Sequence, residues 1–181
     1  MQFIKELLRH FMIKLPQHRN YILSLFILLN TMAVKAETVQ QSAMKKLSFL
    51  VGSWAGDGQS FDDKGGISSY YDTEDVWFDV QESVLIIQAK GFRNNEQFYG
   101  IHTVIYYDEE NKHYWYNPYT AKGSRPFSCT LSEQVFTCLT ESETFRLTFQ
   151  RTKNGLWNEF GERLVDGTWH KTFETRLKER E

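Results

Sequence analysis

Apolar and polar residues alternate along most of the chain after residue 50, and amphipathic stretches with the length and period of a helix are missing. The segment ETFRLTFQRT, residues 143–152, illustrates this alternation: Phe145, Leu147 and Phe149 lie on one face of a strand, and the polar residues between them lie on the other. Aromatic and β-branched residues, which are typical of strands, are abundant. The pattern predicts an all-β protein.

Turn residues divide this region into about ten strands joined by short loops. Because the loops are short, neighbouring strands should pair in sequence order, and a sheet of this length closes on itself or exposes two long edges. Closure gives a single antiparallel up-and-down β-barrel. We expect residues 38–50 to form a short N-terminal helical plug at one end. The predicted strands are 52–61, 66–79, 83–92, 97–107, 112–118, 123–131, 135–141, 143–151, 155–164 and 167–177.

Residues 1–36 differ in character from the rest and have the features of a signal peptide. Basic residues precede an apolar run at residues 21–34 that is too short to cross a bilayer comfortably as a helix. Small residues follow it, so we expect cleavage between Ala36 and Glu37 and export to the periplasm or out of the cell. The alternatives left open are an uncleaved membrane anchor and, for a cleaved leader, a translation start at Met12.

The segment that remains, residues 37–181, has the length of one domain and an acidic balance. Removing residues 1–36 takes away five of 21 basic residues and one of 23 acidic residues, which leaves 16 against 22 and a formal charge of −6. Nucleic acids and anionic membrane surfaces bind clustered Lys and Arg, which this sequence lacks. We therefore expect no nucleic-acid partner and no stable membrane insertion after processing.

The chain contains two cysteines, Cys129 and Cys138. If Glu133 and Gln134 form a two-residue hairpin loop, the two cysteines oppose each other at a non-hydrogen-bonded pair of an antiparallel ladder, close enough for a disulfide. Export would favour its oxidation. The alternative is a pair of free thiols buried as small apolar residues.

The segment LSFLVGSWAGDGQS, residues 47–60, is rich in glycine but has neither the spacing of a dinucleotide fingerprint nor the Lys-Ser/Thr of a phosphate-binding loop. In a strand, Gly52, Gly56 and Gly58 share a face with Trp54, which suits a strongly bent barrel strand where backbones approach closely. These residues are therefore predicted to help close the barrel.

Residues 49–58 resemble the opening strand of calycin-type barrels, in which Gly-x-Trp recurs in lipocalins, fatty-acid-binding proteins and avidins. The longer Phe-Leu-x-Gly-x-Trp-x-Gly-x-Gly form is most similar to nitrobindin-like haem barrels and to bacterial exported barrel families of unknown function, whose last strand resembles residues 166–179. The resemblance implies a barrel that holds a ligand. It also implies that Trp54 caps the closed end beneath a cation from the last strand, here Arg176 or Lys178.

The histidines of the expected mature chain, His102, His113 and His170, have no recognisable metal-binding spacing. Similarity to nitrobindin-like barrels implies the alternative that His170 is an axial haem ligand. On its predicted strand, however, His170 shares a face with polar residues, which favours a solvent-facing histidine. We expect no metal and no cofactor, with haem bound through His170 as the alternative.

Aromatic residues are concentrated in a predicted hairpin, residues 104–120, and occur on both of its faces. Such side chains suit the walls of a pocket for a flat or amphipathic molecule. The predicted ligand-contacting residues are Tyr106, Tyr114, Trp115, Tyr116 and Trp77.

No catalytic residue is predicted, and an enzyme is not expected. The serines lack a G-x-S-x-G elbow, and the carboxylates Asp72, Glu74, Asp75 and Glu174 are expected on exposed strand faces. We therefore predict an exported barrel that binds a small hydrophobic or amphipathic molecule in its interior. The alternatives are the haem barrel and a structural or partner-binding barrel with a filled core.

Overall fold

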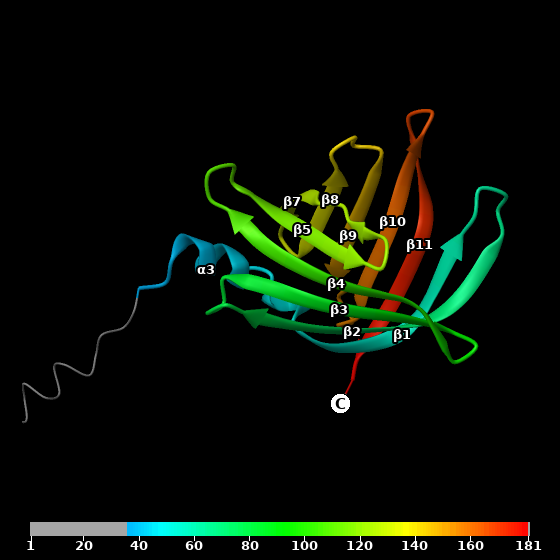
Figure 1. Ribbon diagram of the computed structural model, residues 1–181, viewed down its shortest axis with the longest axis horizontal. Coiled ribbons are helices and arrows are strands. Elements are labelled where there is room, and N and C mark those ends of the chain that lie inside the picture. Colours follow the sequence, from blue (N-terminus) through cyan, green and yellow to red (C-terminus); the bar gives the residue numbers. More distant parts are fainter. Residues whose placement is uncertain (1–35, 181) are drawn as a thin grey trace, which may run out of the picture. The chain divides into compact units, whose positions relative to one another are not determined.

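The computed structural model describes residues 36–180, and Figure 1 shows its strands wrapped into a barrel. Residues 1–35 of the predicted leader lie outside the described residues, as do Met12 and the apolar run; Ala36 and Glu37 are exposed at the start of the described part. The elements are α3 (Val39–Lys45), the 3₁₀ helix η1 (Ser48–Leu50), β1 (Gly52–Phe61), β2 (Ile67–Asp79), β3 (Val84–Arg93), β4 (Glu96–Asp108), β5 (His113–Thr120), β6 (Gly123–Ser124), β7 (Phe127–Ser132), β8 (Val135–Thr140), β9 (Phe145–Arg151), β10 (Trp157–Val165) and β11 (Thr168–Glu179).

The strands form one antiparallel sheet that closes on itself, which confirms the predicted all-β barrel. Successive strands pair in sequence order, with β4 pairing with β5 and β5 continuing to β7. The two-residue β6 pairs with the last two residues of β5 and is not part of the closed ring, which contains ten strands. In Figure 1 the chain runs from the cyan β1 through the green and yellow strands to the red β11.

The barrel closes by pairing its first strand with its last. This pairing was predicted, because an open sheet would expose two unpaired edge strands. In β1 and β11, Trp54 opposes Glu179, and Ser60 opposes Phe173. Gly52 has φ +145°, a conformation that side-chain-bearing residues rarely adopt. At Gly56 a Cβ atom would collide with the Arg176 carbonyl oxygen. Glycine is therefore required at both positions of the seam.

One predicted strand, residues 123–131, is divided in the structure into β6 and β7. Pro126 lies in the break and has no N–H to donate to a ladder, so the pairing cannot run through it. Residues 38–50 form the expected helical segment. Its helix α3 begins with a capping box, in which Thr38 and Gln41 each bind the other's backbone N–H.

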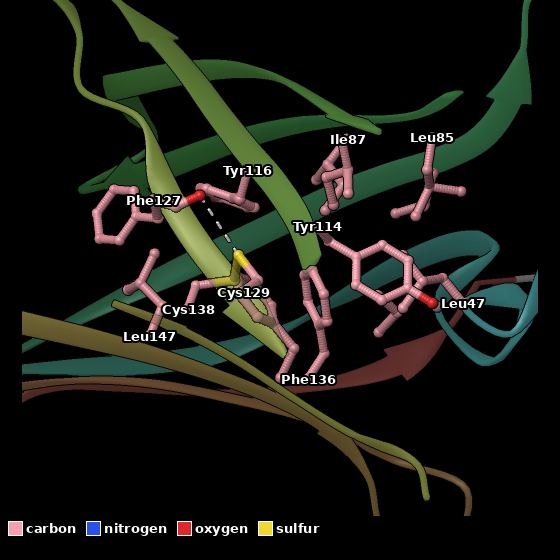
Figure 2. Close-up of a cluster of buried hydrophobic side chains, with 14 of the residues drawn as sticks. Leu47, Leu85, Ile87, Tyr114, Tyr116, Phe127, Cys129, Phe136, Cys138 and Leu147 are labelled. Atoms are coloured by element: carbon pink, nitrogen blue, oxygen red, sulfur yellow. Dashed lines mark hydrogen bonds between the residues drawn. A yellow bond between two sulfur atoms is a disulfide. The ribbon is translucent and has the colours of Figure 1, made fainter. Parts of the chain in front are cut away.

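The helical segment packs against an apolar cluster that fills part of the barrel (Figure 2). Tyr114 Oη donates a hydrogen bond to the Ala43 carbonyl at 2.9 Å, and the Tyr114 ring packs edge-on against Phe136. Met44 and Leu47 are fully buried in the same cluster. The helix thus covers apolar strand residues that would otherwise contact water. Within residues 36–180, no helix is long and apolar enough to cross a bilayer.

Trp54 belongs to this cluster and is fully buried. Its Nε1 donates a hydrogen bond to the Leu50 carbonyl at 2.9 Å, and its ring packs edge-on against Trp157 at 5.6 Å. The cation above the indole is Arg151 of β9, 5.0 Å from the ring centroid, and not the expected Arg176 or Lys178. Both of these residues are exposed, because alternation along β11 turns them outward while Leu177 points inward.

Cys129 and Cys138 are joined by a disulfide between β7 and β8, as the hairpin register predicted. The loop is the two residues Glu133 and Gln134, and Glu133 has the positive φ that such tight turns require. Both sulfurs lie in the apolar cluster, as Figure 2 shows.

Replacing both cysteines with alanine is expected to lower the free energy of unfolding by about 2–3 kcal/mol, because the disulfide restricts the unfolded chain. Urea unfolding of the oxidised protein, the reduced protein and the double variant measures this. The reduced protein should match the variant. Oxidised and reduced proteins with the same stability would contradict the prediction.

Candidate functional site

The barrel contains an inner cavity of about 230 Å³ next to the apolar cluster. It reaches the surface beside Phe98, which is 48% exposed. Ile87 and Tyr116, both labelled in Figure 2, line the cavity and also belong to the apolar cluster. The residues that line the inner cavity are Ser60, Tyr70, Asp72, Glu74, Ile87, Ala89, Phe98, Tyr99, Ile101, Tyr116, Glu159 and Phe173.

Three carboxyl groups of the inner cavity are buried: Asp72 is 2% exposed, Glu74 3% and Glu159 9%. Along β2 the alternation turns Tyr70, Asp72 and Glu74 inward. The expectation that Asp72 and Glu74 lie on an exposed face was therefore wrong. Sequence reasoning also missed Glu159, which points inward from β10. The strands β1 and β11 lie between β10 and β2 in the sheet.

Three glycines make room for the aromatic side chains of the inner cavity. Gly58 opposes Tyr70 across β1 and β2, Gly91 opposes Tyr99 across β3 and β4, and Gly161 opposes Phe173 across β10 and β11. A Cβ atom at any of these glycines would collide with the opposing ring. Each ring therefore covers the backbone of its partner strand, an arrangement in which an aromatic residue compensates for a strand glycine.

Hydrogen bonds fix two of the tyrosines. Tyr99 Oη donates to Asp72 Oδ2 at 2.6 Å, and the Tyr70 hydroxyl pairs with the Thr175 hydroxyl at 2.8 Å. Asp72 Oδ1, the other oxygen of that carboxylate, is buried and has no hydrogen-bond partner among the described residues. A buried acceptor of this kind carries a desolvation cost that a donor in the cavity would relieve.

The carboxyl groups of the inner cavity hold protons more tightly than carboxyls in water. Burial, and next the negative charge of Glu159, raises the pKa of Glu74 well above its ordinary value. Burial likewise raises the pKa of Glu159 to about 7 and that of Asp72 to about 6. The Glu74 and Glu159 carboxyls face each other in the cavity, and their interaction adds to the rise in the pKa of Glu74 and opposes the rise at Glu159. None of the twelve residues that line the cavity is basic.

This arrangement can act in two ways. With protons in place, the carboxyls donate hydrogen bonds to a neutral polar group; once ionised, they attract a cation into an apolar surrounding where charge interactions are strong. The apolar walls, which include Ile87, Ala89 and Ile101, can hold the hydrocarbon part of a ligand.

Of the five predicted ligand-contacting residues, Tyr116 lines the inner cavity. Tyr114 points inward but packs beneath α3. Trp77 and Tyr106 are more than a third exposed, and Trp115 borders a hollow lined mainly by exposed residues and donates from Nε1 to Asp108. An interior role for these three is therefore corrected, because alternation places them on the outer face of the barrel.

His170 is exposed on β11, and no histidine is among the residues that line the inner cavity. His102 is exposed, and the His113 ring packs against Trp115, a residue of the outer face. Axial ligation of haem requires an imidazole in an apolar pocket. The residues present do not fit a haem site. Residues 36–180 also contain no group of three His, Cys, Asp or Glu side chains placed to hold a metal ion.

No protein family matches the sequence, and no curated protein is significantly similar to it. Among solved structures, the fold is similar to the crystal structure of Rv2717c from M. tuberculosis. The TM-score is 0.55 at 10% sequence identity, and the match covers 81% of this chain and 100% of that chain. At this identity the similarity concerns the barrel fold alone.

Proposed function

We propose that the protein binds a small hydrophobic or amphipathic molecule in the inner cavity. The observation that carries this proposal is a cavity with apolar walls into which a few buried polar groups converge, the usual composition of a small-molecule site. Its volume of about 230 Å³ is below the usual range of about 300–1,000 Å³, which favours a ligand smaller than most drugs.

The resemblance of residues 49–58 to the opening strand of calycin-type barrels supports the same function, since those barrels hold ligands inside. The placement of the packed core supports it further. The apolar cluster fills the barrel beneath α3, whereas the inner cavity carries buried carboxyls that a purely structural core would not need. Buried carboxyls with strongly raised pKa values cost folding free energy and are typical of functional sites.

The proposal predicts that filling the cavity abolishes ligand binding. Ala89 is buried in the cavity wall, so Ala89→Phe would occupy the space, whereas Ala121 is exposed in a turn and Ala121→Phe is the matched control. Protein purified from its host and measured by native mass spectrometry should carry a small-molecule adduct in the wild type and the control, and none in Ala89→Phe.

Circular dichroism shows whether Ala89→Phe has folded, and the smaller change Ala89→Leu, which also narrows the cavity, replaces it if it has not. An adduct retained by a folded cavity-filling variant would refute binding at this site. So would a wild type that carries no adduct in the same measurement.

We also propose that the protein is exported after removal of residues 1–36. The leader-like sequence supports this, and the disulfide is of a kind that persists in oxidising compartments. Fractionation of the host and N-terminal sequencing should find the protein outside the cytoplasm with Glu37 as its first residue. A membrane-bound form that retains the apolar run at residues 21–34 would support the uncleaved anchor instead.

A further inference from the structure

We propose that the ligand of the inner cavity is a small organic cation, a protonated amine with a compact apolar body, whose ammonium group is bound by Asp72, Glu74 and Glu159. This inference rests on the proposed function and specifies the class of ligand. It follows from the buried carboxyl groups of the cavity and from the positive charge and hydrogen-bond donors that they lack.

The first argument is the unbalanced charge of the site. Asp72, Glu74 and Glu159 are each more than nine-tenths buried, and none of the twelve residues that line the cavity is basic. Buried carboxylates are normally paired with cations, because an isolated one pays a large desolvation cost. Without a ligand cation, protons offset this cost, since burial raises the pKa values of all three groups and the charges of neighbouring carboxylates raise those of Glu74 and Glu159 further. A ligand cation would supply the missing positive charge.

The second argument is the unpartnered acceptor Asp72 Oδ1. Tyr99 holds the other oxygen of this carboxylate at 2.6 Å, so Oδ1 remains for a ligand. Glu74 and Glu159 provide further carboxyl oxygens in the same cavity. An ammonium group has three donors and no acceptor, which matches a site whose unused groups are acceptors.

The third argument is the aromatic wall. Tyr70, Tyr99 and Tyr116 line the cavity together with Phe98 and Phe173. The faces of aromatic rings attract organic cations, and their area also buries an apolar body. A bare metal ion would make no use of this wall, and residues 36–180 offer no metal-binding arrangement of carboxylates and histidines.

Calorimetry with a matched pair of probes tests the inference. Benzylamine is protonated near neutral pH, and benzyl alcohol has a similar shape without the charge. Wild-type protein should bind benzylamine at least about tenfold more tightly than benzyl alcohol, because a hydrogen-bonded charge pair is stronger than a neutral one.

Glu159→Gln and Glu74→Gln keep the shape of the site and remove a charge. Each should weaken benzylamine binding at least about tenfold and leave benzyl alcohol binding within about twofold. Glu141→Gln, in the exposed turn between β8 and β9, removes the same charge outside the cavity and should bind both probes as the wild type does. Because each substitution replaces a buried ionisable carboxyl with a neutral amide of the same shape, the variants are expected to fold, and circular dichroism checks that they do.

A second readout separates an ion pair from a change of shape. Benzylamine binding should release protons near neutral pH, because the ammonium group replaces protons held by Glu74 and Glu159, whereas the tyrosines, with raised pKa values, keep theirs. Titrations in two buffers of different ionisation enthalpy measure this release. Benzyl alcohol should release none.

Equal affinity for the two probes, or a preference for benzyl alcohol, would overturn the inference and leave the proposed function intact. A wild type that binds neither probe yet carries an adduct in native mass spectrometry has the same meaning. Benzylamine binding that Glu141→Gln weakens as much as Glu159→Gln would place the cation on the surface and overturn the inference as well.

Discussion

Replacing Trp54 with alanine is expected to lower the free energy of unfolding by about 3–5 kcal/mol, the usual cost of removing a large buried aromatic side chain. The side chain is fully buried, packs against Trp157, lies beneath Arg151 and donates to the Leu50 carbonyl. Its removal would leave a cavity beside the seam of the barrel and an unpaired carbonyl. Urea unfolding followed by circular dichroism measures the change.

His170→Ala is the control, because His170 is exposed on the last strand. It should change the free energy of unfolding by less than about 1 kcal/mol. Equal losses in the two variants would mean that Trp54 is not the residue on which this part of the barrel depends.

The free energy of unfolding is expected to fall as the pH rises from about 5 to about 8. The pKa of Glu159 is about 7 in the folded protein, above the ordinary value of about 4.3, and the pKa values of Asp72 and Glu74 are raised in the same direction. Unfolding therefore releases protons throughout this window, and a group with a raised pKa stabilises the fold while it stays protonated. For Glu159 alone the loss is on the order of 3 kcal/mol.

Carboxyls with lowered pKa values do not reverse the fall in the free energy of unfolding between about pH 5 and 8. Asp75, hydrogen-bonded by Ser53, and Asp108, hydrogen-bonded by Asn111, have lowered pKa values, so the stability that they contribute is lost in more acidic solution. The decline between about pH 5 and 8 should therefore come from the buried carboxyls of the inner cavity.

Glu159→Gln tests this assignment. The variant cannot ionise at residue 159, so its stability should depend less on pH and should exceed that of the wild type at the alkaline end of the range. Glu141→Gln should leave the slope unchanged, because Glu141 is exposed. Parallel curves for the wild type and Glu159→Gln would show that Glu159 does not titrate in this window.

Several features of the protein were determined by sequence alone because they depend on local chemistry. Alternation of apolar and polar residues predicted the strands, and short turns predicted pairing in sequence order. Pairing of β1 with β11 followed, since an open sheet would expose two edges. The spacing of Cys129 and Cys138 around a two-residue loop predicted their disulfide, because a tight hairpin fixes its own register.

The inner cavity was decided by the tertiary structure. Asp72 and Glu74 have the side chains that sequence patterns place in water, and only the closed register of β1, β2 and β3 shows that they share the inner face with Val76 and Ala89. Transfer of a carboxyl into an apolar interior is unfavourable, so local rules assign it to the surface.

Contacts between strands that are distant in the sequence could not be predicted from the sequence either. Arg151 reaches Trp54 from β9, Glu159 meets Glu74 from β10, and Gly58 accommodates Tyr70 across the β1–β2 pair. The sequence by itself determined that the chain closes into a barrel, because closure follows from strand length, turns and edges. Which side chains meet inside it was decided by the tertiary structure, because a shift of one residue in any strand exchanges its inner and outer faces.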